Sequence, residues 1–389
     1  MATFLRPAAP PSADEGSLNR QSTPGAKRLA LLLPDMRGGG AERVALRLIE
    51  FFLEAGHQVD LVLLERKGEL LPLVPDAVHI VSLDAPRIRS AIRPLVRYFK
   101  SREPHAIQIS MWPLTIAGIV AQRLAGARAR VVVSDHIALS KQYGSRAVGW
   151  TTRIAYPLAD ARILVSANAA DDLARISGLP RSSIEVIYNP VEKPAAGSAP
   201  IEDLEALWGG GPRIITVGSF KDQKNHAMLI RSFARLLRRR PAKLMILGDG
   251  PLRPALEALA RAEGVAEHVS MPGFRTDPWP YYASADLFAL SSDYEGYPLV
   301  LIEALRSGLP VVSTDCETGP GEILADGRYG RLVPVGDDAA FAQALEQVLN
   351  LPNDRERLMQ RAEELSGPGT SQRYLELMLG DPAPDEARV

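Results

Sequence analysis

Two glutamates eight positions apart, Glu295 and Glu303, form the pair of residues around which the possible chemistry of this sequence is arranged. Gly296 and Pro298 lie between them and predict a loop that turns into a helix, because proline is preorganised for the first helical position. The start of that helix offers free amide groups and the positive end of its dipole. A phosphate could bind there while each acid holds a sugar hydroxyl. An ordinary surface acid and an ion-paired helix acid would use the same residues, so both interpretations stand at this point.

A glycine-rich turn at 38–40 follows an expected strand at 27–33 and precedes a helix and a second strand. This order is a βαβ unit and predicts a parallel sheet. Gly39 and Gly40 would let the backbone approach a ligand at the helix N-terminus. A dinucleotide fingerprint would need a third glycine where Arg43 stands, which disfavours a nicotinamide-dependent oxidoreductase.

A histidine ends another expected strand, at 130–136, where the sequence reads Ser-Asp-His. Open α/β sheets place their functional groups at the carboxyl ends of strands, so His136 is positioned to face a ligand. A single histidine is more often a structural residue, and that alternative also stands.

Four loops in the second half follow expected strands and should gather at one edge of a second sheet. One carries Lys221 and Lys224, which can supply positive charge to a phosphate. The others are the turn 248–251, the segment with the two glutamates, and the loop 273–277. Each loop alone is common, but their common position predicts a ligand cleft.

Strands and helices alternate on both sides of a stretch rich in proline and glycine, which predicts two domains in tandem. We expect a disordered leader at 1–24, a first domain at 25–192, a second domain at 205–365, and a C-terminal segment and tail at 366–389. The predicted class is α/β, with two doubly wound domains whose strand ends face a shared cleft.

The composition excludes several classes of protein. A formal net charge of −1 argues against affinity of the whole chain for nucleic acid. The single cysteine, Cys316, leaves no internal disulfide framework. No apolar run reaches the ~20 residues that cross a bilayer, and the leader lacks the apolar core of a signal peptide. We therefore expect a cytoplasmic protein.

Residues 87–102 are basic and carry apolar residues at helical spacing, although Pro94 interrupts them. A basic amphipathic helix can lie on an anionic membrane surface. A domain helix with a charged solvent face has the same pattern, so peripheral attachment to the inner face of the membrane is one of two interpretations.

The order and spacing of these motifs resemble those of retaining, nucleotide-sugar-dependent glycosyltransferases of the two-Rossmann (GT-B) type, specifically glycosyltransferase family four. The resemblance covers Leu29 to about Asp337, and its most specific part is the segment within 291–304. The other matching motifs are Gly-Gly-Ala-Glu-Arg at 39–43, Ser-Asp-His at 134–136, Tyr-Asn-Pro-Val at 188–191, Gly-Ser-Phe-x-x-Gln-Lys-Asn at 218–225, Gly-Asp-Gly-Pro-Leu at 248–252 and Thr-Gly-Pro-Gly-Glu-Ile-Leu at 318–324.

The resemblance implies a role for each matching residue. Glu303 would hold the ribose hydroxyls of the nucleotide, and Glu295 the hydroxyls of the donor sugar. Lys224 would bind the diphosphate, and His136 would face the reacting centre. The implied site has His136, Glu295 and Lys224 as catalytic residues, and as donor-binding residues Gly39, Gly40, Ser219, Lys221, Lys224, Gly250, Phe274, Arg275, Glu295, Gly296, Tyr297, Pro298, Leu299 and Glu303.

One position departs from the family pattern. Ser219 stands where the family often has an arginine that helps to neutralise the diphosphate, and Lys221 is expected to substitute for it. No cofactor or metal is expected, because lysines and helix amides can stabilise a leaving diphosphate. Similar enzymes retain the anomeric configuration, and the departing phosphate oxygen takes the acceptor proton.

The predicted function is transfer of a hexose or N-acetylhexosamine from a nucleotide diphosphate sugar to a glycan or lipid-linked acceptor in cell-surface polysaccharide synthesis. A uridine diphosphate sugar is the first expectation for the donor, and a guanosine diphosphate sugar the second. Three alternatives use the same residues: a non-catalytic sugar-nucleotide-binding homologue, a sugar-nucleotide epimerase, and a hydrolase that uses the two carboxylates as acid and nucleophile.

Overall fold

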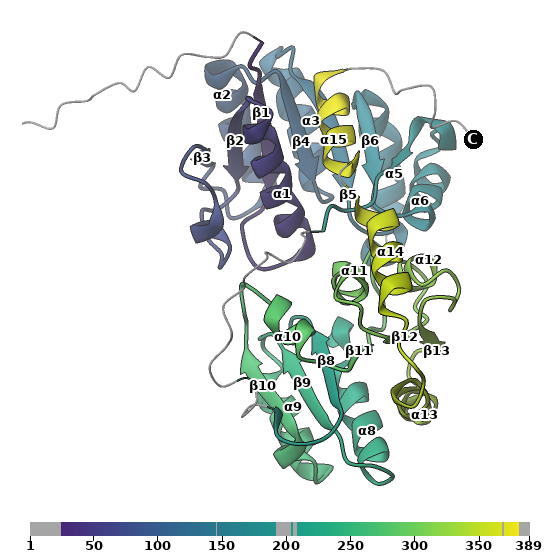
Figure 1. The fold of residues 1–389 in the computed structure, drawn as a ribbon. Helices are drawn as coiled ribbons and strands as arrows, with labels where there is room; N and C mark the ends of the chain where they lie inside the picture. The colour runs from purple at the N-terminus through teal and green to yellow at the C-terminus, as the bar shows by residue number, and fades with distance from the viewer. Residues whose placement is uncertain (1–24, 145, 192–203, 205–207, 368, 381–389) are drawn as a thin grey trace, which may run out of the picture.

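The fold consists of two parallel β-sheets, each covered by helices on both faces (Figure 1). A computed structural model describes residues 25–144, 146–191, 204, 208–367 and 369–380. The first sheet has the strand order β3-β2-β1-β4-β5-β6-β7. Its strands are β1 (Arg28–Leu33), β2 (Gln58–Leu63), β3 (His79–Ser82), β4 (Ala106–Ser110), β5 (Arg130–Asp135), β6 (Ala161–Leu164) and β7 (Glu185–Val186).

The second sheet has the order β10-β9-β8-β11-β12-β13, and all its described pairs are parallel. Its strands are β8 (Arg213–Val217), β9 (Lys243–Leu247), β10 (Val269–Gly273), β11 (Leu287–Leu290), β12 (Val311–Thr314) and β13 (Arg331–Val333). In both sheets the strand order reverses beside the first strand of the domain, which is the point where open α/β sheets bind ligands.

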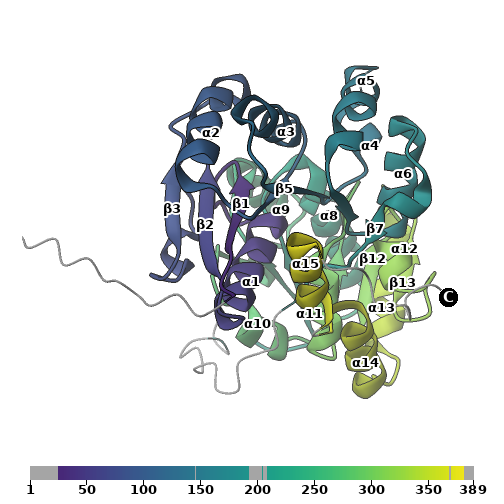
Figure 2. The ribbon, with the colours of Figure 1, turned by 90° about the horizontal axis from the view of Figure 1, so that it is seen from above.

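The helices of the first domain form two layers (Figure 2). One face of the sheet packs against α1 (Gly40–Glu54), and the apolar side of this helix carries Val44, Leu48 and Phe52 into the core. The other face packs against α2 (Ile88–Arg102), α3 (Leu114–Ala125), α4 (Leu139–Tyr143), α5 (Arg146–Ala155) and α6 (Ala167–Ser177).

The second domain is also layered. Helices α8 (His226–Leu237), α9 (Arg253–Ala262) and α13 (Asp338–Leu349) cover one face of its sheet. The other face packs against α10 (Trp279–Ala283), α11 (Leu299–Arg306), α12 (Pro320–Ile323) and α14 (Arg355–Ser366). The described chain also contains single turns of 3₁₀ helix: η1 (Leu71–Leu73), η2 (Tyr156–Leu158), η3 (Arg181–Ser183), η4 (Asp222–Lys224) and η5 (Ala266–His268).

The last helix, α15 (Gly369–Leu379), returns to the first domain and packs beside α1 (Figure 1). The Arg373 guanidinium pairs with Glu185 at 2.7 Å, and Arg130 donates a hydrogen bond to the Leu377 carbonyl at 2.7 Å. Tyr374 is fully buried against β5. The C-terminal segment, for which the sequence predicted no packing partner, therefore packs on the first domain through α15.

The structure confirms the predicted α/β class with two doubly wound units, and it contains the strands predicted at 27–33 and 130–136. Strands β3 and β4 were not predicted, although β4 lies between β1 and β5 in the first sheet. Helix α11 begins at Leu299, with Pro298 as its N-cap rather than its first residue. Helix α2 continues through Pro94. The predicted leader and the end of the tail lie outside the described residues.

Candidate active site

The loops that follow β5 and β11 meet where the two domains face each other. A methyl group at Gly296 would overlap the carbonyl oxygen of His136 and would lie 2.6 Å from the Ile137 side chain. Gly40 faces the Leu299 side chain, and Gly38 lies against the Phe274 ring. The carboxyl ends of both sheets therefore face one shared site, as the sequence predicted.

Glu295 is held by a buried ion pair with Lys224. The distance from Lys224 Nζ to Glu295 Oε1 is 2.6 Å, and the side chains are 16% and 6% exposed. Ser292 Oγ donates to the same carboxylate oxygen at 2.6 Å. Because an ammonium group has three donors, the pair can position Lys224 and leave it capacity to bind an anion. These two residues are 71 positions apart and meet because β8 and β11 are neighbours in the sheet.

Glu303 is buried on α11 and binds a tyrosine. Tyr282 Oη donates a hydrogen bond to Glu303 Oε2 at 2.7 Å. Burial, together with the facing carboxylate, raises the pKa of Tyr282 far above its usual range, so the phenol stays protonated and remains a donor. No described residue donates to the other carboxylate oxygen, which leaves it available to a ligand hydroxyl. The alternative of a surface acid beside an ion-paired helix acid is wrong, because both glutamates are buried and only Glu295 is ion-paired.

The backbone of His136 lies against Gly296. Both of its ring nitrogens are buried, and neither has a hydrogen-bond partner among the described residues. Burial lowers the pKa of His136 to about 4, with the neighbouring Asn189 side chain acting in the opposite direction. The imidazole is therefore neutral near pH 7. One of its nitrogens can donate a hydrogen bond to a bound sugar, and the other can accept one from it.

Ser219 and Lys221 follow β8 at the same edge. Ser219 is half-buried and Lys221 is exposed. Burial raises the pKa of Glu42 in the first domain, and the positive charge of Lys221 acts on that carboxyl in the opposite direction. Lys221 thus lies close enough to the domain boundary to act on an anion bound there. This position is required if Lys221 is to replace the arginine that the family often has at position 219.

The remaining predicted residues shape the loops. Gly250 has φ +158°, and a side chain there would meet the Phe220 backbone at 2.7 Å. Arg275 Nε donates to the Tyr281 hydroxyl at 2.8 Å. The Tyr297 ring stacks on Tyr188, with centroids 5.2 Å apart. In this structure Tyr297 therefore packs the two domains together, and Pro298 lies against Gly319 on the neighbouring loop.

Two acidic residues of the site received no role from the sequence. Burial raises the pKa of Glu42, on the first turn of α1, to about 7. Burial also raises the pKa of Asp135 to about 6, partly offset by the hydrogen bond that Tyr156 Oη donates to Asp135 Oδ2 at 2.6 Å. Both acids stand within motifs that the sequence analysis singled out, but their burial depends on residues far along the chain.

The folded protein should lose stability in acid through His226, the first residue of α8. Burial, with a smaller effect of Lys224, lowers the pKa of His226 to about 4. The unfolded chain binds this proton near pH 6.5, so the stabilisation is complete above that pH and is lost as the pH falls toward 4.

We expect wild type to lose about 2 kcal/mol between pH 7 and pH 5 through this residue. His226→Gln should show a correspondingly shallower loss of unfolding free energy in urea titrations at the two pH values, whereas His79→Gln, at an exposed position, should follow wild type. An equal loss of unfolding free energy between pH 7 and pH 5 in His226→Gln and wild type would show that His226 does not cause the acid sensitivity.

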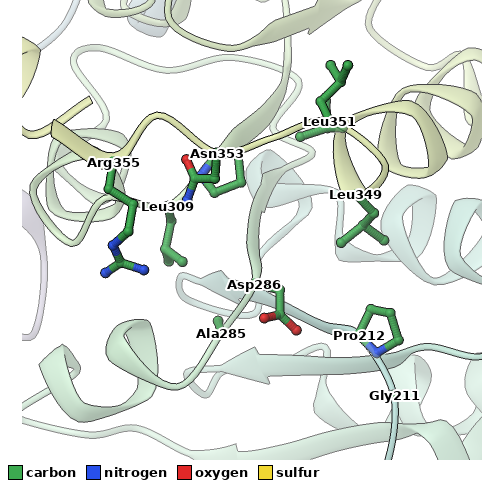
Figure 3. A pocket seen from close by; sticks show the side chains of 11 residues that line it. Gly211, Pro212, Ala285, Asp286, Leu309, Leu349, Leu351, Asn353 and Arg355 are labelled. Atoms are coloured by element: carbon green, nitrogen blue, oxygen red, sulfur yellow. The ribbon is translucent and has the colours of Figure 1, made fainter. Parts of the chain in front are cut away.

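A cavity of about 450 Å³ lies at the opposite end of the second sheet (Figure 3). Its lining includes Pro212, Asp286 and Pro310, which precede β8, β11 and β12. Amino ends of parallel strands are not where these folds bind substrates. The cavity is therefore separate from the site. Within the described residues, no group of histidine, cysteine and acidic side chains could hold a metal ion.

Two family models match the chain, one in each half. The family model for glycosyl transferases group 1 matches residues 205–365, and the model for glycosyltransferase family 4 matches residues 38–193. The chain belongs to this glycosyltransferase family. The protein is therefore a glycosyltransferase.

Relatives of this protein are themselves glycosyltransferases. An N-acetylgalactosaminyltransferase of Campylobacter jejuni that acts on a diphospho-undecaprenol-linked sugar is 28% identical over 337 residues, covering 83% of this chain and 90% of the relative. The lipopolysaccharide 1,6-galactosyltransferase of Escherichia coli is 31% identical over 179 residues, covering 44% of this chain and 48% of the relative.

Solved structures confirm the GT-B fold. Anabaena HepE in complex with UDP and glucose superposes with a TM-score of 0.75 at 18% identity, covering 91% of this glycosyltransferase and 99% of that chain. The lipopolysaccharide outer core galactosyltransferase WaaB superposes with a TM-score of 0.69 at 19% identity, covering 91% and 99%.

Proposed function

We propose that this glycosyltransferase moves a hexose or N-acetylhexosamine from a uridine diphosphate sugar to a glycan or lipid-linked acceptor, in the synthesis of a cell-surface polysaccharide. The observation that carries the proposal is the arrangement around the start of α11. The Lys224–Glu295 pair, the buried Glu303 and the neutral His136 all lie around that helix terminus.

The start of α11 and Lys224 are the groups suited to hold the donor diphosphate. The first amides of a helix have no partner within the helix and favour an anion. Lys224 adds a positive charge that grows in value as the glycosyl–phosphate bond breaks and negative charge develops on the diphosphate. Lys221 reaches the same boundary and takes the part of the missing arginine.

The two glutamates and His136 would orient the donor. Glu303, which keeps one carboxylate oxygen free of described donors, would accept hydrogen bonds from the ribose hydroxyls. Glu295 is fixed by Lys224 and Ser292, so it would position sugar hydroxyls rather than attack the anomeric carbon. The acceptor would approach on the face of the departing diphosphate, whose oxygen takes the acceptor proton.

The ligands and substrates named for similar proteins support the proposed donor and acceptor classes. HepE, which shares the fold, was solved with UDP and with UDP-glucose. The Campylobacter relative acts on a diphospho-undecaprenol-linked sugar. These proteins support a uridine diphosphate sugar and a lipid-linked acceptor for this chain. No helix among the described residues is long and apolar enough to span a membrane.

The proposal is tested by incubating the purified protein with a panel of UDP- and GDP-sugars and with polyprenyl diphosphate-linked sugars. The expected product carries the transferred sugar with the anomeric configuration of the donor, read by NMR coupling constants. Inversion at the anomeric carbon would contradict the proposed chemistry. Conversion of the donor without any acceptor would instead show an epimerase.

Transfer should persist in the presence of a chelator. Lys224 and the α11 amides supply the positive charge that a divalent ion provides in other folds. We expect initial rates with 5–10 mM EDTA, a concentration of the order used to remove divalent ions, to stay within about twofold of the untreated rate, since bound metal would be worth several kcal/mol. A loss that only added magnesium or manganese restores would overturn this expectation.

A further inference from the structure

Large apolar side chains are exposed on the outer surface of one helical layer of the first domain. Trp150 and Ile154 stand one turn apart on α5 and are 69% and 53% exposed. Leu124 at the end of α3 is 64% exposed. The exposed members of this layer are Val120, Leu124, Trp150, Ile154 and Leu158, and we call them the apolar ridge. The ridge residues lie on α3 and α5, which contact each other, and on the turn after α5. Exposed apolar patches mark interaction sites.

Three helices of this layer, α2, α3 and α5, carry only positive charge, whereas α6 in the same layer also contains Asp171 and Asp172. The sequences of α2, α3 and α5 contain eight arginines and lysines and no acidic residue, whereas the whole chain has a net charge of −1. The exposed basic side chains are Arg89, Arg93, Arg97, Lys100, Arg123 and Arg153. Positive charge is therefore concentrated on the surface that also exposes the apolar ridge.

Hydrogen bonds join the parts of this surface. Arg123 Nη2 of α3 donates to the Leu158 carbonyl at 3.0 Å, and Trp112 Nε1 before α3 donates to Thr151 Oγ1 of α5 at 3.2 Å. Helix α2 packs along α3, and Figure 2 shows α2, α3 and α5 on the same side of the first sheet. The ridge and the basic helix therefore belong to one face.

We propose that this face binds an anionic phospholipid surface, with the apolar ridge entering the interface and the arginines contacting the phosphate groups. Tryptophan is favoured at the boundary between lipid and water, and basic residues are attracted to anionic lipid. A second copy of the chain is a poorer occupant, because symmetric pairing would bring two basic faces together.

The position of the face suits an enzyme with a lipid-linked acceptor. Helices α2 and α3 follow β3 and β4 and so begin at the edge of the sheet that carries the site, and α5 follows His136 and α4. Docking by this face would hold the site beside the membrane. This benefit rests on the proposed acceptor, but the binding itself does not.

Cosedimentation of the full-length protein with vesicles tests the surface. Vesicles of phosphatidylglycerol and phosphatidylethanolamine should retain the protein, whereas phosphatidylcholine vesicles should not. The charge variant Arg93→Glu with Arg97→Glu should weaken binding by about fivefold or more for each residue changed. The apolar variant Trp150→Ser with Ile154→Ser should also release the protein, and raising the salt concentration should weaken wild-type binding.

Two variants of the second domain serve as matched controls. Leu351→Ser with Met359→Ser removes apolar side chains that are 65% and 48% exposed, and Arg235→Glu with Arg238→Glu reverses two exposed charges. All variants should keep the wild-type Tm and affinity for uridine diphosphate, which separates this proposal from the proposed function. The proposal would be overturned if the wild-type protein did not bind the vesicles or if the control variants also lost vesicle binding. It would also be overturned if the protein were a dimer that Trp150→Ser dissociates.

Discussion

Glu303→Ala is expected to reduce transfer by about a thousandfold or more, measured as kcat/KM at saturating acceptor. In the proposed function, the buried carboxylate accepts charge-assisted hydrogen bonds from two ribose hydroxyls, each worth roughly 1.5–3 kcal/mol. Alanine removes these bonds and also leaves the buried Tyr282 hydroxyl without its acceptor. The same change should weaken uridine diphosphate binding, because the ribose belongs to product and substrate alike.

Tyr282→Phe is the matched control for this prediction. It removes the hydrogen bond of 2.7 Å to Glu303 but leaves the carboxylate in place. We expect a reduction of roughly tenfold, the value of one such hydrogen bond. Activity of Glu303→Ala within tenfold of wild type would show that the carboxylate does not bind the donor.

Gly296→Ala should reduce kcat by about a hundredfold, because misplacement by about 1 Å at a reacting centre has an effect of this size. The added methyl group would overlap the His136 carbonyl oxygen, so the loop of the second domain could not approach β5 as closely. Donor binding depends mainly on groups of the second domain and should change less than kcat.

Gly210→Ala provides the comparison, because a side chain there meets no atom within 4 Å and the backbone is not left-handed. It should leave kcat, KM and Tm close to wild type. A Gly296→Ala enzyme with unchanged kcat would mean that close contact between the domains at this point is not needed for transfer.

Local motifs allowed much of the fold to be predicted. Continuous apolar runs, such as the one that forms β1, predict buried strands from the local sequence alone. The central strand β4 was missed because Gln108 and Ser110 interrupt its apolar pattern, and these polar residues are buried only through the neighbouring strands. The return of α15 was also missed, since its partners Glu185 and Arg130 lie about two hundred residues away along the chain, at separations of 188 and 247.

The candidate site could likewise be predicted only in part from the sequence. Its residues could be named from motifs in which the spacing along the chain carries the information. The interactions between these residues could not be predicted from the sequence. The Lys224–Glu295 ion pair and the Tyr282–Glu303 hydrogen bond depend on how segments far apart in the chain pack together. The elevated pKa of Glu42 likewise arises from burial, which one segment of sequence does not reveal.

The most direct test of the account is isothermal titration of the purified protein with uridine, guanosine and adenosine diphosphates and NAD, each with and without EDTA. We expect uridine diphosphate to bind, with an affinity that the chelator leaves unchanged and that Glu303→Ala weakens. Binding of NAD alone, or of none of these ligands, would contradict the proposal that the site between the two domains holds a uridine diphosphate sugar.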